Sequence, residues 1–396
     1  MVYNIIFILL LYLSYSYDFH NHKNGRNEWY YAILVFFILF AGLRWRLGID
    51  TPNYIYHFYY SIPEIEKLTD DDLNLGSKPL WILLNSAVKT LGGRYFIVQL
   101  IEAAFVNVLI FNYFKRHSRY VFTCIFFYYV FLYLSFSFTI MKAAMSIVVC
   151  LYANDYILQK KWVKGYMLYL ISALFHPQAI LIMLTPFLLF LKLNKKSVLL
   201  LSFLYVLGFF VQDYLGDSLF LFDFDEDIYD KVENVATSDR YSSRTSNFNY
   251  AIVNILPYFI YALLSLYAIK RFRPNSNLLK FESFVIIYLC FIVLEMNVFI
   301  SYRFALYYTI YFILLLSESF VEFASLRQKS KYRTKVFLKS LLIVLPFLFL
   351  LGYRSYQRAW GFNPYSSVIE RNIDKTREQN RFELHPYGPR ANRDEY

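Results

Sequence analysis

Charged side chains are scarce in this sequence. Asp, Glu, Lys and Arg make up 17% of the 396 residues, whereas hydrophobic residues make up 58% and aromatic residues 21%, and the mean hydropathy is +0.37. A soluble domain of this composition would lack the polar surface that must face water. The apolar runs also lack the period-two alternation of transmembrane β-strands. Helices that cross a lipid bilayer are the fold class that these absences leave.

Cysteine is also rare, which limits the chemistry of the thiols. Cys124, Cys150 and Cys290 all lie inside apolar runs, where a free thiol behaves as a small hydrophobic group. Their number and spacing allow neither a disulfide framework nor a zinc site. The net charge of +11 is spread over short basic clusters between apolar runs and forms no single patch. We therefore expect a lipid bilayer around the chain and no nucleic acid partner.

The apolar runs predict a polytopic, all-α membrane domain over residues 1–352. We expect about twelve transmembrane helices, within a range of roughly ten to fourteen, because several runs are shorter than the about 20 residues that a span needs. Residues 1–17 lack a basic leader and a cleavage site, so they are predicted to be a retained span. The predicted helices are 2–17, 29–43, 95–114, 120–137, 140–158, 163–175, 178–192, 197–213, 250–269, 281–299, 303–321 and 336–352.

Two long loops and the tail are predicted to be external. The loops are residues 44–94 and the acidic residues 214–249, and the polar tail over 353–396 is predicted to be periplasmic or extracellular, with a short helix over 365–377. Within the first loop, residues 79–91 are apolar but too short for a standard span, so we interpret them as re-entrant or lying on the surface. An extra span there would invert the chain upstream of it.

The distribution of Lys and Arg predicts the orientation. Alternate loops are rich and poor in basic residues, and the rich set is predicted to be cytoplasmic, which leaves both termini outside. The cytoplasmic set is Lys23, Arg26, Lys115, Arg116, Arg119, Lys160, Lys161, Lys164, Lys192, Lys195, Lys196, Lys270, Arg271, Arg273, Lys280, Arg327, Lys329, Lys331, Arg333 and Lys335.

A few ionisable residues lie in or beside predicted helices, where charge is costly and therefore indicates function. With the predicted orientation, each falls at the outer end of its helix. Arg and Lys suit a lipid-linked diphosphate, because a guanidinium binds phosphate oxygens in pairs and an ammonium adds a compact charge. A carboxylate or imidazole among them is a candidate general base toward a hydroxyl. The candidates are Arg44, Arg46, Asp50, Lys142, His176, Glu295 and Arg303, with Asp50 or His176 as the base.

Ordinary structural roles remain open for the same residues. The two arginines can anchor a helix end at lipid headgroups, Lys142 can reach to the interface, and Arg303 can pair with Glu295. His176 can be a turn residue, and Asp50 can cap the helix that follows it.

A run of three carboxylates is the remaining candidate for a metal. Asp70, Asp71 and Asp72 can bind a cation together with a diphosphate, but we prefer to interpret them as the start of a solvated helix. No metal site is therefore predicted.

Five segments carry a resemblance to a known family. Residues 43–54 read LRWRLGIDTPNY, residues 173–180 read ALFHPQAI, and weaker matches lie at 91–96, 302–308 and 363–365. The first resembles the pattern R-[YF]-x-x-G-x-D-x-x-x-Y of the EpsG family, and the second its A-x-x-F-H-x-[ST]-A turn. That family is similar to Wzy-type exopolysaccharide and O-antigen polymerases. The fifth helix departs from it, because Lys142 and Ala143 stand where the family has Arg-Gln, so the charge is kept but the guanidinium fork is lost.

The resemblance implies a glycosyltransferase in the bacterial cytoplasmic (inner) membrane that needs no cofactor. It would join undecaprenyl-diphosphate-linked repeat units into exopolysaccharide, capsule or O-antigen at the outer face, with a flippase and a chain-length regulator as further partners. The implied catalytic residues are Asp50 and His176, and the implied substrate-binding residues are Arg44, Arg46, Tyr54, Lys142, Glu295 and Arg303.

Two other functions fit parts of the same pattern. A flippase or transporter of the lipid-linked unit would carry charge along a path through the membrane and show internal symmetry, but Glu102 is the main mid-membrane charge and no repeat is evident. A membrane acyltransferase or ligase that acts on an exported glycan would use His176 in catalysis.

Overall fold

The molecule is a bundle of helices. A computed structural model describes residues 2–74, 76–218, 255–295 and 301–325, and further along the chain residues 338–342, 344–346, 348, 362 and 365–371. Within these residues the regular structure is helical, apart from one isolated antiparallel bridge between Arg44 and Ser367. The predicted all-α class is therefore confirmed for the described part of the chain.

The helices follow one another with short connections. They are α1 (Val2–Leu13), η1 (Ser14–Phe19), α2 (Arg26–Gly42), α3 (Thr51–Tyr56), η2 (His57–Ser61), η3 (Ile65–Lys67), α4 (Pro79–Thr90), α5 (Tyr95–His117), α6 (Val121–Tyr128), η4 (Tyr129–Tyr133), α7 (Leu134–Phe138), α8 (Met141–Leu158), α9 (Trp162–Phe175), α10 (Ala179–Ile182), η5 (Thr185–Leu188), α11 (Lys195–Ser218), α15 (Leu256–Phe272), η8 (Asn277–Phe281), α16 (Glu282–Glu295), α17 (Ser301–Ala305) and α18 (Thr309–Ser325).

Five helical segments of the described chain are long and apolar enough to cross a membrane. They are Val2–Phe19, Tyr95–His117, Val121–Phe138, Met141–Leu158 and Asn277–Glu295, and Trp162–Phe175 is a shorter apolar helix. The predicted count of twelve spans is not confirmed. Residues 214–249 and the tail 353–396 lie largely outside the described residues, and of residues 336–352 the structure describes 338–342, 344–346 and 348, which are helical.

Two predicted spans are interrupted in the structure. Residues 178–192 form only α10 and the 3₁₀ turn η5, whose first turn contains Pro186, and proline lacks the N–H that a continuing α-helix requires. Residues 303–321 are divided between α17 and α18 by a turn at 306–308. Residues 79–91 form α4, whose 12 residues extend only about 18 Å, less than the about 30 Å of a bilayer core, and their re-entrant or surface location stays a prediction.

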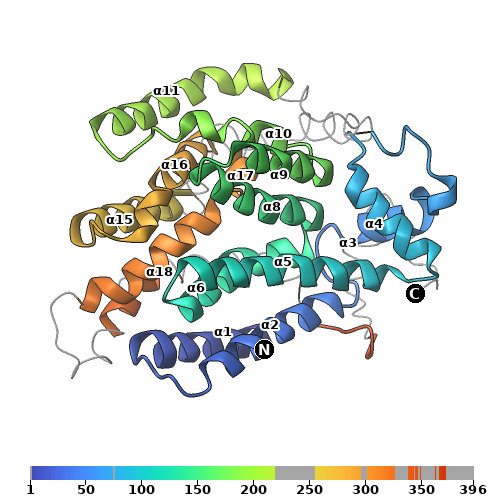
Figure 1. Ribbon diagram of the computed structural model, residues 1–396, viewed down its shortest axis with the longest axis horizontal. Helices are drawn as coiled ribbons and strands as arrows, with labels where there is room; N and C mark the ends of the chain where they lie inside the picture. Colours follow the sequence, from blue (N-terminus) through green and yellow to red (C-terminus); the bar gives the residue numbers. More distant parts are fainter. Residues whose placement is uncertain are drawn as a thin grey trace.

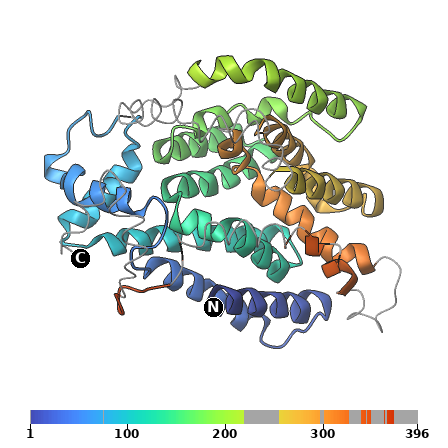
Figure 2. The same ribbon diagram turned by 180° about the vertical axis from the view of Figure 1, so that it is seen from behind.

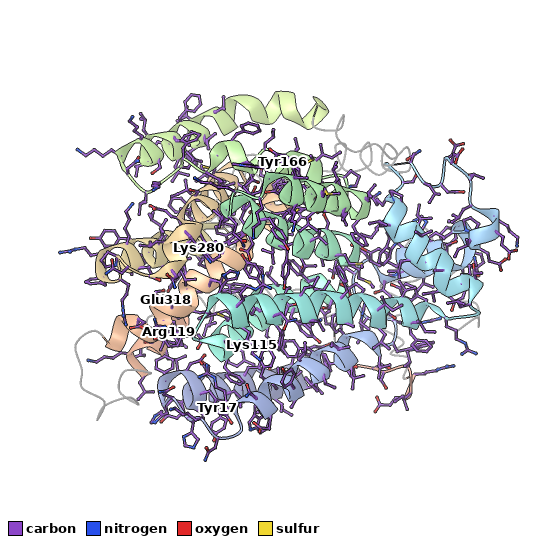
Figure 3. The ribbon with its side chains drawn as sticks, in the orientation of Figure 1. Tyr17, Lys115, Arg119, Tyr166, Lys280 and Glu318 are labelled. Carbon is purple, nitrogen blue, oxygen red and sulfur yellow. The ribbon has the colours of Figure 1, made fainter. Side chains whose placement is uncertain are left out.

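Helices α1, α2 and α5 run along the long axis of the molecule, and α3 and α4 lie together at one end of it (Figures 1 and 2). There α4 packs against α5 and α9, and within the bundle α8 packs along α9 and α2 along α5. We call the end of the molecule that contains α3 and α4 the α4 end. Figure 3 labels Lys115, Arg119 and Lys280 on the side away from α4, which we call the basic end.

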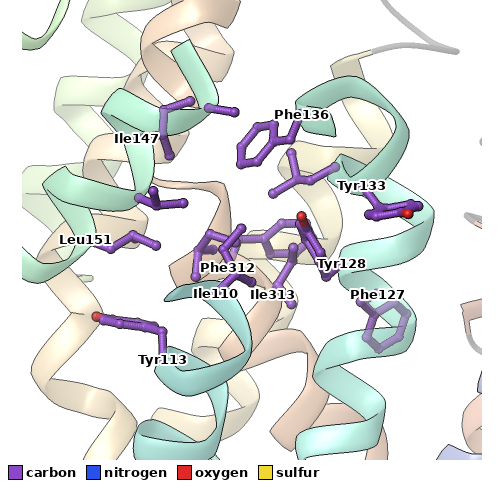
Figure 4. Packing of buried hydrophobic residues seen from close by; sticks show 14 of the residues in the cluster. Ile110, Tyr113, Phe127, Tyr128, Tyr133, Phe136, Ile147, Leu151, Phe312 and Ile313 are labelled. Atoms are coloured by element: carbon purple, nitrogen blue, oxygen red, sulfur yellow. The ribbon is translucent and has the colours of Figure 1, made fainter. Parts of the chain in front are cut away.

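Aromatic side chains fill the centre of the bundle (Figure 4). Tyr113, Tyr128 and Tyr133 are completely buried there. Each of their hydroxyls donates a hydrogen bond, to Asp155 Oδ1 at 3.1 Å, to Asn107 Oδ1 at 3.1 Å and to the Phe37 carbonyl at 2.6 Å respectively. Tyrosine can therefore supply bulk to this core without leaving a polar atom unsatisfied.

The described part of the C-terminal segment packs onto the bundle near the end of α2. The ring of Tyr365 stacks on Phe40 with the ring centroids 4.2 Å apart, and its hydroxyl donates to the Phe40 carbonyl at 2.9 Å. The backbone N–H of Trp45 donates to Ser366 O, and that of Val368 donates to Leu43 O, each at 2.8 Å. The helix predicted over 365–377 is therefore wrong over residues 365–371, where the backbone pairs with residues 43–45 instead.

Candidate functional site

Three hydroxyl side chains hold three helix ends together at the α4 end. Ser146 lies four residues after Lys142 in α8, Ser172 lies four residues before His176 in α9, and Tyr307 lies four residues after Arg303. Ser146 Oγ is 2.7 Å from Ser172 Oγ and 3.0 Å from the Tyr307 hydroxyl, and all three residues are buried. Because four residues make about one helical turn, this network brings Lys142, His176 and Arg303 toward one another.

His176 follows the last residue of α9 and lies among cations. Its backbone N–H donates to Ser172 O at 3.0 Å, and its Nδ1 atom is enclosed with no hydrogen-bond partner among the described residues. Burial first, and then the charges of Lys78, Lys142 and Arg303, lower the pKa of His176 well below its usual value. The imidazole is therefore neutral near pH 7 and able to accept a proton.

Tyr54 and Asp50 lie beside this group, at the start of α3. Lys142 Nζ lies 5.5 Å from the centroid of the Tyr54 ring, and burial raises the pKa of Tyr54 well above its usual value, so its hydroxyl stays protonated. Asp50 stands at the N-cap of α3, where its side chain makes no capping hydrogen bond and its carbonyl accepts from Tyr54 N at 3.1 Å. The carboxylate instead lies within electrostatic range of Tyr54 and Tyr95.

Arg44 lies inside the protein. Its side chain is fully buried and donates to Ala41 O at 2.6 Å and to Leu47 O at 3.1 Å. Its guanidinium carbon also lies 4.8 Å from the Phe138 ring centroid. These contacts fix the turn after α2, and phosphate binding by Arg44 stays a prediction.

Gln99 and Glu102 of α5 face the same guanidinium. With its amide oriented to satisfy both partners, the Gln99 oxygen accepts from Arg44 Nε and Nη1 at 3.1 Å. Glu102 is fully buried, lies within electrostatic range of Arg44, and has no hydrogen-bond partner for either carboxylate oxygen among the described residues. Glu102 therefore lies buried beside the Arg44 guanidinium.

Arg46 lies against Trp45 on the other side of the same turn. Its backbone has a φ of +50°, and its guanidinium carbon is 5.5 Å from the Trp45 ring. Arg371 of the C-terminal segment lies 5.2 Å from the same ring. Two guanidinium groups therefore contact one indole, a pairing of distant segments that sequence order alone does not indicate.

Glu295 and Arg303 flank residues 296–300, which lie outside the described residues. Glu295 is buried as the last residue of α16, and Arg303 is exposed in α17, which packs against α16. Arg303 Nε donates to the Tyr302 hydroxyl at 3.4 Å.

The acidic run in the first loop makes a local turn. Thr69 donates to Asp72 Oδ2 from its backbone N–H at 3.0 Å and from its hydroxyl at 2.6 Å. Among the described residues, no group of three His, Cys, Asp or Glu side chains is arranged to hold a metal ion.

The sequence interpretation missed Lys78. This residue precedes α4 and is only 8% exposed. Of the three cations that lower the pKa of His176, Lys78 has the largest effect. Its only sequence signal is that it directly precedes Pro79 and the apolar stretch 79–91. Tyr95, at the start of α5, was missed as well; its hydroxyl contacts Met141 Sδ at 3.5 Å, next to Lys142.

Hydrogen bonds at the basic end join loops that the charge distribution predicts on one side. Arg26 Nη2 donates to the Arg119 carbonyl at 2.8 Å, and Lys280 Nζ contacts His117 Nδ1 at 3.1 Å. His117 Nε2 in turn lies 2.8 Å from Asp155 Oδ2. The basic clusters near 26, 119 and 280 therefore meet at the end of the bundle opposite His176.

A helical bundle with apolar spans and a polar site at one end defines a multi-pass membrane protein. The sequence profile of the EpsG family matches residues 27–367, so the chain belongs to the EpsG family, an exopolysaccharide-associated family of Wzy-like polymerases. The protein is thus a membrane protein of polysaccharide biosynthesis. Neither the search of curated proteins nor the search of solved structures finds a match.

Proposed function

We propose that this protein is a glycosyltransferase that lengthens a lipid-linked glycan at the α4 end. The glycan on one undecaprenyl diphosphate is transferred to a sugar hydroxyl of a second lipid-linked repeat unit. The bond between the anomeric carbon and the diphosphate oxygen breaks, and a bond from that carbon to the acceptor oxygen forms. The hydroxyl proton passes to a base, and the diphosphate leaves with the bonding electron pair.

The observation that carries the proposal is the grouping of cations around a neutral imidazole. Lys142 and Arg303 act electrostatically on His176 from two other helices. A departing diphosphate gains negative charge, and fixed cations stabilise that charge without having to reorganise.

We assign the role of base to His176. Its enclosed Nδ1 has no partner among the described residues, whereas Asp50 lies among tyrosines. A bound diphosphate offsets the nearby positive charges and raises the pKa of the imidazole, so His176 becomes a stronger base only when substrate is present. In this scheme Asp50, Tyr54, Arg46 and Glu295 contact the glycan or diphosphate, and Arg44 supports the turn that carries Arg46 and Asp50.

The proposed location is the outer face of the bacterial cytoplasmic membrane. The loops at the basic end carry the Lys and Arg residues that favour the cytoplasm, so the α4 end with His176 faces outward. The proposed products are exopolysaccharide, capsule or O-antigen, and a flippase and a chain-length regulator are proposed partners because the substrate must be exported and the product sized.

Reconstitution with a lipid-linked repeat unit tests the proposal. Purified protein in nanodiscs is expected to convert one repeat into a ladder of longer lipid-linked glycans, in the presence of chelator, and His176→Asn is expected to abolish the ladder. Appearance of the repeat on the far leaflet of vesicles without any lengthening would indicate a flippase instead. Acylation or transfer to a non-lipid acceptor would indicate the third function.

A further inference from the structure

Lys78 is held at the site by the helix that it precedes. The backbone N–H groups of Trp81 and Ile82 donate to the Lys78 carbonyl at 3.0 and 3.1 Å. The centroid of the Trp81 ring lies 5.5 Å from that of the Tyr54 ring. Lys142 Nζ also lies 5.5 Å from the centroid of the Tyr54 ring. Helix α4 also packs against α9, the helix that ends before His176. These contacts place the start of α4 near Lys142, and they place α4 against the helix that ends before His176.

The backbone of Lys78 is left-handed, with a φ of +62°. L-residues with a Cβ avoid this conformation, whereas glycine and asparagine adopt it readily. Such backbone persists where the surroundings hold it, and it gathers at functional sites. Lysine at this position therefore carries a backbone strain that glycine or asparagine would largely avoid.

The rest of α4 is clamped to the segment before it. Lys89 Nζ donates to the carbonyls of Phe58 and Tyr59, each at 3.1 Å, and to that of Ile62 at 2.8 Å. Ser86 Oγ donates to Pro63 O at 2.5 Å. These bonds join the second half of α4 to residues 58–63, so the helix that follows the buried Lys78 is held in place within the loop.

We propose that Lys78 is a diphosphate-binding residue that completes a cationic cradle with Lys142 and Arg303. The inference rests on the proposed function and adds a specific residue to it. Three cations from α4, α8 and α17 then surround the leaving group, so the external loop containing α4 is part of the substrate site. The enclosed, unpartnered Nδ1 of His176 points to a ligand at this place.

Three variants test this role. Lys78→Asn removes the charge but suits the left-handed backbone, and Lys78→Arg keeps the charge. Lys67→Asn is the matched control, because Lys67 is exposed in the same loop and pairs with Glu64 at 3.0 Å. Binding of inorganic pyrophosphate and of undecaprenyl diphosphate is measured in nanodiscs, together with the rate of ladder formation and the melting temperature.

The expected result is selective. Lys78→Asn should bind both probes roughly tenfold to a hundredfold more weakly, the effect of losing one charge-assisted hydrogen bond, while melting at or above the wild-type temperature. The acid limb of its rate, which is the fall in rate at low pH, should also lie at higher pH than in the wild type, because one charge that lowers the pKa of His176 is gone. Lys78→Arg and Lys67→Asn should stay close to wild type in binding.

Separate outcomes overturn separate claims. If the wild-type protein makes a ladder and Lys78→Asn binds and reacts equally well, the role of Lys78 is overturned and the proposed function stands. The role of Lys78 is also overturned if Lys78→Asn binds weakly, melts at a lower temperature and keeps the wild-type pH profile. Lys78 would then be a structural residue. If the wild-type protein makes no ladder and Lys78→Asn loses the pyrophosphate binding of the wild type, the polymerase function is overturned and the anion site stands.

Discussion

Gly48 lies directly against the carbonyl of Phe138. A Cβ atom at position 48 would stand 1.8 Å from the Phe138 oxygen, and the φ of Gly48 is +113°. We therefore expect Gly48→Ala to lower the free energy of unfolding by roughly 3 kcal/mol or more, because it combines strain with a backbone clash. Gly92→Ala is the control: its φ is +72° with nothing within 4 Å, so about 1–2 kcal/mol is expected. Equal losses in thermal unfolding would show that the contact with Phe138 does not matter.

The pH dependence of activity should report on His176. Burial and three nearby cations lower its pKa below the usual value of about 6.5, so the imidazole is neutral above that pH. We expect kcat/KM, which reports on the free enzyme, to be level from roughly pH 6.5 to 8 and to fall only at lower pH, where protonation removes the base.

Two variants check that assignment. Arg303→Gln should move the acid limb of the rate to higher pH, because one cation that disfavours protonation is removed. His176→Asn should lose about 10²- to 10⁴-fold in rate and show no acid limb, whereas His22→Asn, an exposed histidine, should behave as wild type. An unchanged acid limb in His176→Asn would assign the titrating group elsewhere.

Ser172 should position the site without contacting substrate. Its hydroxyl donates to Ser146 O at 2.8 Å and lies 3.0 Å from Cys150 Sγ, so Ser172→Ala should cost about 1 kcal/mol of stability. Because the network sets the spacing of His176 and Lys142, we expect kcat to fall roughly tenfold or more with a smaller change in KM. Ser202→Ala, at an exposed position of α11 where the hydroxyl donates to Val198 O at 3.1 Å, is the comparison. A lowered melting temperature with unchanged kcat would restrict Ser172 to a role in the fold.

Asp155 should matter for stability and little for chemistry. Its carboxylate accepts from Tyr113 at 3.1 Å and lies 2.8 Å from His117 Nε2, and it is only 5% exposed. Asp155→Asn replaces one accepting oxygen with a donor, so we expect a loss of about 1.5–3 kcal/mol in thermal unfolding. Asp71→Asn, at an exposed position near the α4 end, should change stability little. Reduced activity of correctly folded Asp155→Asn would contradict the separation of the two ends.

The positions of most helices were predictable because hydrophobicity acts locally along the chain. Residues 95–114, 140–158 and 163–175 were predicted close to α5, α8 and α9. The failures came at Pro186 and at the turn before Thr309, where short-range backbone chemistry interrupts an apolar run. Composition measures how apolar a run is, and it is less sensitive to where a helix breaks.

The sequence by itself determined that His176, Lys142 and Arg303 would lie near helix ends on one side, because charge avoids the bilayer core and basic loops orient the spans. Only the tertiary structure decided that Arg44 turns inward onto Ala41 and Leu47 while Lys78 comes to lie beside His176. The reason is physical: whether a cation is enclosed by carbonyls or directed toward a ligand depends on which distant helix ends meet, and no local pattern of residues encodes that meeting.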